Sequence, residues 1–99
     1  MTLYGARFEW DAEKNRINDK NHGIDFETAS LVFYDENRIE FYDEAHSERE
    51  DRYNVIGMVR NILFVVYTER KGSIRIISAR EADPKERRLY YDRTLYPSR

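Results

Sequence analysis

The sequence contains no cysteine, which excludes disulfide bonds and every metal site built on thiolate ligands. Histidine is scarce too: His22 and His46 stand 24 residues apart, a spacing that matches no common zinc motif. A glycine-rich nucleotide loop is also missing, since the four glycines of the chain lie far from one another. We therefore expect a protein that needs neither a metal ion nor another cofactor.

Long apolar runs are absent as well. No stretch approaches the ~20 consecutive apolar residues that a membrane-spanning helix needs, and the first residues do not form a signal-peptide pattern. The sequence predicts a soluble, cytoplasmic protein that does not contact a membrane. With 99 residues, of which 40% are hydrophobic, it is long enough for one domain over residues 1–99.

Charged residues are abundant, at 36% of the chain, and they are unevenly distributed. Residues 1–69 hold 8 Lys/Arg and 15 Asp/Glu, a charge of −7, whereas residues 70–99 hold 9 and 4, a charge of +5. A chain of this kind can present a basic surface to nucleic acid while the rest repels it. An ordinary solvated surface, on which the charges mix after folding, explains the counts as well.

The apolar pattern changes along the chain from a helical to a strand-like period, which predicts an α+β fold. Asp11 and Gly23 fit the two ends of a first helix, and Asp25 fits the start of a second. Short turns between the later strands favour an antiparallel meander. The expected order is a short strand at 7–10, helices at 11–22 and from 25 onward, four strands at 39–42, 49–59, 62–68 and 75–80, and a final helix that begins after Asp83.

Three apolar segments are expected to supply the core. The second helix should bury Phe26, Ala29, Leu31, Val32 and Phe33. The run 62–68 is almost continuously apolar, which is typical of a central strand covered on both faces. In the final helix, Leu89 and Tyr90 have the spacing to pack against the sheet.

The strongest functional signal is a strand with an arginine at each end, Arg75 and Arg80. A guanidinium stays charged when it is buried, and cations held on a rigid strand suit the binding of a phosphate or a carboxylate. The alternative is that Arg80 anchors the interior by bonding loop carbonyl groups.

Glu50 and Arg52 form a second signal. On an extended chain they share one face, and a carboxylate beside a cation can act as a base next to a bound phosphate. A surface ion pair explains them equally well. His22, just before Gly23, is either a helix-end residue or a proton donor, and His46 is either a solvated loop residue or a phosphate contact.

Taken together, two histidines, the Glu50 and Arg52 pair and clustered arginines suit cleavage of a phosphodiester without metal. RNA permits this reaction because its 2′-hydroxyl is an internal nucleophile, so DNA should stay intact.

The order of several short motifs resembles the BrnT family over roughly residues 7–93. The matching segments are Phe8-Glu9-Trp10-Asp11, Asn18, His22-Gly23-Ile24, Phe26-Glu27, His46-Ser47, Glu50, Arg52, Arg75 to Arg80, Glu86-Arg87-Arg88 and Tyr90. The family consists of toxins of type II toxin–antitoxin systems. The resemblance implies a RelE-like ribonuclease fold, cleavage of RNA to arrest growth, and neutralisation by an antitoxin called BrnA. It also implies two toxins on an antitoxin dimer, and contact with DNA only through that antitoxin.

One position departs from the family pattern. Its members usually have a lysine directly before the His-Gly pair, where this chain has Asn21, and Lys20 is the adjacent cation that can replace it.

Our leading hypothesis is therefore a metal-independent endoribonuclease toxin. It assigns catalysis to His22, Glu50, Arg52 and Arg80, and substrate binding to Lys20, His46 and Arg75. Two alternatives remain open: a module that binds nucleic acid or an antitoxin without cleaving RNA, and a structural partner whose arginines meet acidic residues of the antitoxin.

Overall fold

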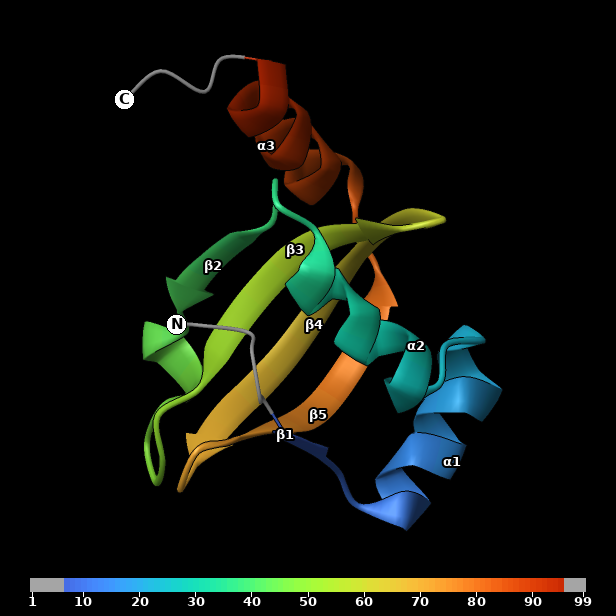
Figure 1. Cartoon of the computed structure of the whole chain (residues 1–99), viewed down its shortest axis with the longest axis vertical. Helices are drawn as coiled ribbons and strands as arrows, with labels where there is room; N and C mark the ends of the chain where they lie inside the picture. Colours follow the sequence, from blue (N-terminus) through green and yellow to red (C-terminus); the bar gives the residue numbers. More distant parts are fainter. Residues whose placement is uncertain (1–6, 96–99) are drawn as a thin grey trace.

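The computed structural model describes residues 7–95, which form three α-helices, two short 3-10 helices and one five-stranded sheet. In chain order the elements are β1 (Arg7–Glu9), α1 (Ala12–His22), α2 (Phe26–Ser30), η1 (Leu31–Tyr34), β2 (Ile39–Tyr42), η2 (Glu44–His46), β3 (Tyr53–Val59), β4 (Asn61–Arg70), β5 (Ser73–Glu81) and α3 (Pro84–Leu95) (Figure 1). The α+β class and the order of elements are confirmed. None of the helices in these residues is long and apolar enough to span a membrane.

The sheet has the order β1-β5-β4-β3-β2. Strands β2 to β5 form the antiparallel meander that the short turns predicted. The short strand β1 joins the outer edge of β5 in parallel, with Arg7 opposite Ser73 and Glu9 opposite Arg75. This pairing, which the sequence did not indicate, places the beginning of the chain beside the arginine strand.

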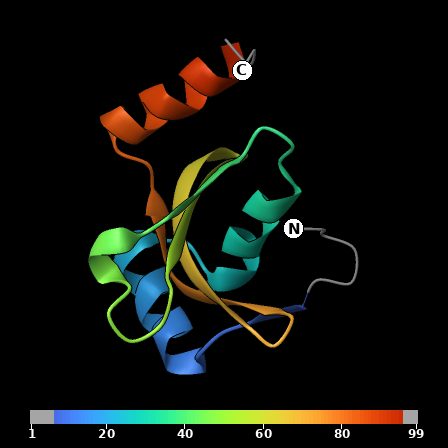
Figure 2. The ribbon, with the colours of Figure 1, turned by 90° about the vertical axis from the view of Figure 1, so that its left-hand side faces the viewer.

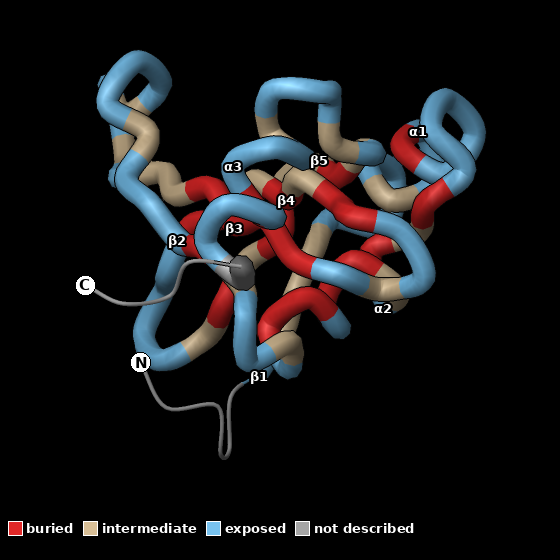
Figure 3. Tube along the Cα trace, turned by 90° about the horizontal axis from the view of Figure 1, so that it is seen from above, coloured by how far each residue is buried: buried red, intermediate tan, exposed pale blue. Residues whose placement is uncertain are grey.

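The two faces of the sheet are covered to different extents. One face packs against α2 and η1 in the larger core, where Phe26 and Phe33 meet Val65 and Tyr67. The other face packs at one end against α3, where Ile56, Ile62 and Tyr90 form a smaller cluster. Figure 2 shows α2 on one side of the sheet and η2 on the other, with α3 running across the upper end of the sheet. Buried residues follow the central strands, whereas α3 is largely exposed (Figure 3).

Capping residues set both ends of α1 and the start of α3 as the sequence predicted. The backbone N–H groups of Glu13 and Lys14 donate to the Asp11 carboxylate at the start of α1, and Gly23 ends this helix with φ at 70°. Asp83 and Glu86 form a capping box at the start of α3, in which each side chain accepts from the other residue's backbone N–H.

The strand expected at 49–59 is four residues shorter at its start and begins at Tyr53, so Glu50 and Arg52 lie in a loop and do not share a strand face. Hydrogen bonds within the connection explain the difference. The Arg52 N–H donates to the Ser47 hydroxyl at 2.9 Å, and the Thr68 hydroxyl donates to the Asp51 carbonyl at 2.6 Å. The Arg52 N–H and the Asp51 carbonyl, which could otherwise pair with a neighbouring strand, are therefore bonded to side chains.

Some burial predictions were wrong. Phe26, Ala29, Val32 and Phe33 are buried as expected, but Leu31 is 49% exposed because the chain tightens into η1 there. Leu89 is also 49% exposed, although Tyr90 is buried. In β4, Phe64 and Val66 are half-buried rather than fully covered, since α3 reaches over only one end of their face.

Candidate active site

The sheet face that α3 leaves uncovered contains a hollow of about 400 Å³, which we call the main hollow. It is lined by Asp43, His46, Arg52, Asn54, Phe64, Val66, Ile77, Ser78 and Arg80. A smaller hollow of about 230 Å³, the loop hollow, is lined by His46, Glu48, Arg49, Glu50 and Arg52. Because His46 and Arg52 line both, four of the seven residues assigned from the sequence come together here: His46, Glu50, Arg52 and Arg80.

A β-bulge determines which face carries the arginines. Val66 pairs with Ser78, but the next residue, Tyr67, pairs with Ile76, so Ile77 has no partner on β4. Arg80 comes five positions after Arg75 in the sequence, and on a regular strand this odd spacing would point the two side chains to opposite faces. With the extra residue between them, Arg75 pairs with Thr68 and Arg80 with Phe64, and both arginines share the open face.

Arg80 is held in a defined orientation at the edge of the main hollow. Its Nη1 and Nη2 donate to the two carboxylate oxygens of Glu86 at 2.8 and 2.9 Å, and its guanidinium carbon lies 4.3 Å from the centre of the Phe64 ring. The hydrogen bonds that Arg80 donates to Glu86 raise the pKa of Arg80. Its Nε bonds no described residue. The Arg80 guanidinium therefore has a fixed position and still has its Nε–H available to donate to a ligand.

His46 is oriented by Asp43, one turn earlier in the connection. Its Nδ1 lies 3.1 Å from both carboxylate oxygens of Asp43. A carboxylate at Nδ1 selects the tautomer in which Nδ1 carries the proton, so Nε2 of the neutral ring is an acceptor. Nε2 bonds no described residue, and the ring is largely exposed. This arrangement suits the removal of a proton from a substrate hydroxyl.

Arg52 is the second cation of the main hollow. Its backbone is fixed by Ser47 and by the Asp43 N–H, which donates to the Arg52 carbonyl at 2.8 Å. Among the described residues no acceptor bonds its guanidinium. Arg52 therefore lines both hollows with a guanidinium that is hydrogen-bonded to none of the described residues.

Glu50 forms an ion pair with Arg70 at the loop hollow, which Arg52 also lines. Both of its carboxylate oxygens accept from Arg70, at 3.1 to 3.3 Å. These hydrogen bonds lower the pKa of Glu50, which makes the carboxylate a weaker base. The surface ion pair that the sequence left open as an alternative is present, but its partner is Arg70 and not Arg52.

Arg75 lies on the same face, farther toward β1. Its Nη1 donates to Glu9 at 2.7 Å, which links β5 to β1. It lines neither hollow, although its charge contributes to the lowered pKa of Glu50.

Lys20 and His22 lie at the edge of β5, in the last turn of α1. This helix is attached to the edge by Asn18, whose Nδ2 donates to the Ala79 carbonyl at 2.8 Å and whose Oδ1 accepts from the Ala79 N–H at 3.1 Å. Both Lys20 and His22 are exposed, and neither is among the residues that line the two hollows.

The residues of the main hollow that were not assigned to a site from the sequence include Asp43, Asn54 and Phe64. Asp43 stands three residues before His46, a spacing that could have indicated an oriented histidine. Asn54 is a polar residue within the apolar strand β3, which is itself an unusual pattern. Phe64 was assigned to the core, and nothing in the sequence distinguishes it from its buried neighbours.

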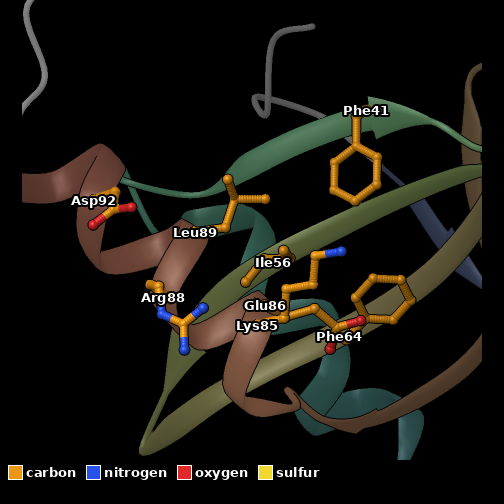
Figure 4. A pocket seen from close by; sticks show the side chains of 8 residues that line it. All are labelled: Phe41, Ile56, Phe64, Lys85, Glu86, Arg88, Leu89 and Asp92. Atoms are coloured by element: carbon orange, nitrogen blue, oxygen red, sulfur yellow. The ribbon is translucent and has the colours of Figure 1, made fainter.

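A third depression, the helix groove, lies between α3 and the sheet and measures about 470 Å³. Leu89 and Lys85 reach from α3 toward Phe41 and Phe64 of the sheet (Figure 4). Since Phe64 also lines the main hollow, the two spaces adjoin.

The combined site offers an oriented imidazole and two arginines on one open face, which suits an anionic substrate with an ionisable hydroxyl. Among the described residues, no three His, Asp or Glu side chains are close enough to hold a metal ion together.

Comparisons with known proteins identify the family of the chain. The family model described as "Ribonuclease toxin, BrnT, of type II toxin-antitoxin system" matches residues 10–86, well over half of the chain. A similar solved structure is the ribonuclease toxin BrnT of Brucella abortus, with a TM-score of 0.64 and 24% identity over 79% of this chain and 97% of the other. At that identity the likeness shows the fold alone. No curated protein matches the chain. The chain belongs to the BrnT family of ribonuclease toxins of type II toxin–antitoxin systems.

Proposed function

We propose that this chain cleaves RNA without a metal ion, through the residues of the main hollow, and thereby arrests growth. The observation that carries the proposal is the Asp43–His46 pair, which faces the same hollow as Arg52 and Arg80. A proton acceptor and two cations that line one hollow would suit a phosphate and its neighbouring hydroxyl.

In the proposed reaction, Nε2 of His46 takes the proton of the ribose 2′-hydroxyl. The 2′-oxygen attacks the adjacent phosphorus, and the bond to the 5′-oxygen of the next nucleotide breaks. Arg52 and Arg80 stabilise the negative charge that develops on the phosphorane. The departing 5′-oxygen takes a proton from water, and the products are a 2′,3′-cyclic phosphate and a 5′-hydroxyl.

Glu50 and Arg75 have supporting roles in this proposal. The Glu50–Arg70 ion pair holds the loop that carries His46 and Arg52, and Arg75 adds positive potential beside the hollow. Lys20 and His22 contribute no step, because they lie outside both hollows.

Induced expression followed by analysis of RNA ends tests the proposal. We expect growth arrest by the wild-type chain and none by Arg80→Ala at an equal soluble level. Purified wild-type protein should then produce cyclic phosphate ends in the presence of EDTA. Fragments with 3′-hydroxyl ends, or cleavage that stops when EDTA is added, would contradict the mechanism.

Membership of a family of type II ribonuclease toxins implies an RNA substrate and a protein antitoxin as partners. We propose an antitoxin of the BrnA type, with two toxins on an antitoxin dimer, DNA contacts made by the antitoxin alone, and a cytoplasmic location where RNA and antitoxin meet. Coexpression with an antitoxin of the BrnA type, followed by mass measurement of the purified complex, tests the 2:2 assembly.

A non-catalytic binding module is the second candidate. The observation that favours it is the neutralisation of Arg80 by Glu86 and of Glu50 by Arg70. Such a module would bind RNA at low salt, lose it steeply as salt rises, and produce no fragments under any condition.

A further inference from the structure

Asn54 carries a polar group that does not contribute to the stability of the fold. It lies near the start of β3, is 6% exposed and lines the main hollow. Its Oδ1 is buried and has no hydrogen-bond partner among the described residues. An unpaired buried amide is less favourable than an apolar side chain of the same size. Folding alone would therefore favour a leucine or valine here.

Asn18 shows what a structural asparagine looks like in the same protein. It is similarly buried, at 7% exposed, but its Oδ1 accepts from the Ala79 N–H and its Nδ2 donates to the carbonyls of Ile24 and Ala79. The Asn18 amide thus bonds the backbone groups of Ala79 that a neighbouring strand would otherwise bond at the edge of β5. The amide of Asn54 has no comparable role.

Phe41 lies directly beside Asn54. The two residues are opposite partners in the β2–β3 register, so their side chains project from the same face about 5 Å apart. Phe41 is 37% exposed, and its ring centre is 6.4 Å from that of Phe64. An accessible aromatic ring and an unpaired amide therefore stand side by side, next to the hollow that Arg52 and Arg80 line.

We infer that Asn54 is a specificity-determining residue: its amide pairs with the hydrogen-bonding edge of a nucleobase that stacks on Phe41. The inference rests on the proposed function, because the base belongs to a nucleotide whose phosphate is held by Arg52 and Arg80. A carboxamide carries a donor and an acceptor side by side, and so matches base edges that carry the same pair. Single-stranded RNA exposes these edges and the flat face that stacks on an aromatic ring.

Cleavage of a mixed pool of single-stranded RNA by the full chain tests the inference. Sequencing of the fragment ends gives the relative frequency of each base next to the cut. We expect the wild type to favour one base and Asn54→Leu to lose that preference, on the order of 10-fold in the ratio of preferred to other bases. Asn54→Asp, which can only accept, should change which base is favoured. Phe41→Leu should slow cleavage of every sequence alike.

This readout separates a specificity role from a structural one. A ratio of products in one tube does not depend on how much of the variant is folded. The matched control is Asn61→Leu, which changes an exposed asparagine at the start of β4 and should keep the wild-type ratios. Asn54→Leu should also unfold at the same temperature as the wild type or higher. Unchanged base ratios in both Asn54 variants would overturn the inference.

A second experiment measures RNA binding, and it tests the inference even if the wild type produces no fragments. His46→Ala protein, with and without Asn54→Leu, is titrated with four labelled RNA octamers that differ only in their central base. We expect affinities that differ between the octamers and become equal after Asn54→Leu. Base-dependent binding without cleavage would reject the proposed catalysis and keep the role of Asn54, whereas equal affinities before the substitution would reject that role.

Discussion

Arg80 and Glu86 form a bidentate ion pair that joins the end of β5 to the first turn of α3, with N–O distances of 2.8 and 2.9 Å. The same Glu86 accepts the Asp83 N–H at 2.9 Å, so one carboxylate caps the helix and orients the arginine. The orientation of Arg80 over Phe64 therefore depends on where α3 begins.

We predict that Glu86→Gln lowers the rate of RNA cleavage roughly 10-fold, because a neutral amide cannot hold both guanidinium nitrogens in one orientation. Arg80→Ala should lower the rate roughly 10²-fold or more, since it removes a cation from the phosphorane. Single-turnover cleavage of a labelled RNA measures both. The unfolding temperature of Glu86→Gln should change little, because glutamine still accepts from the Asp83 N–H.

Glu81→Gln is the matched control, since Glu81 is exposed and contacts Arg80 through its backbone carbonyl alone. Its rate should equal that of the wild type. A faster Glu86→Gln would mean instead that α3 restrains Arg80 and reduces activity.

The Asp43–His46 pair leads to a second prediction. His46→Ala should lower cleavage by roughly 10² to 10⁴-fold, the usual contribution of a positioned base. Asp43→Asn should have a smaller effect, because the ring stays in place while its tautomer is no longer selected. The measurement is single-turnover cleavage with Glu44→Gln as a control in the same turn. A larger loss in His22→Ala than in His46→Ala would move proton transfer to the end of α1.

Asn18 allows a prediction about stability. Its amide makes three hydrogen bonds to backbone groups, and two of them satisfy the open edge of β5 at Ala79. Asn18→Ala should lower the free energy of unfolding by about 2–4 kcal/mol, since it leaves buried N–H and C=O groups unpaired. Urea denaturation measures this change. Asn61→Ala, on the surface, should stay within about 0.5 kcal/mol of the wild type.

The carboxylate of Asp25 leads to a prediction about how the stability of the fold depends on pH. The Thr28 backbone N–H donates to its carboxylate at 2.7 Å, and this bond lowers the pKa of Asp25 below its ordinary value of 3.8. A carboxyl whose pKa is lower in the folded chain stabilises the fold above the unfolded pKa. That contribution is lost as the pH falls from about 4 through the lowered pKa.

Asp25→Asn keeps the helix cap without the titrating group, because asparagine caps about as well as aspartate. We expect equal stability at pH 7 and a shallower decline between pH 4 and pH 2, measured by urea denaturation at each pH. The control is Asp19→Asn, at an exposed position of α1. Parallel declines for the wild type and Asp25→Asn would show that this cap does not contribute to acid sensitivity.

The sequence alone was sufficient for the α+β class, the order of the main elements, both ends of the first helix and the starts of the other two. These features follow from local chemistry: Asp11, Gly23 and the Asp83–Glu86 pair act on backbone groups within one turn of themselves. The resemblance to the BrnT family also rested on residues in order, without reference to their positions in space.

Tertiary structure decided how those residues combine into a site. The bulge at Ile77 depends on the pairing of β4 with β5, and it alone brings Arg75 and Arg80 to one face. The partner of Glu50 is Arg70, twenty residues away, and Glu50 lies in a loop because β3 begins only at Tyr53. A strand pattern in the sequence determines alternation, but register and loop closure depend on contacts between distant segments, so they became known only from the folded chain.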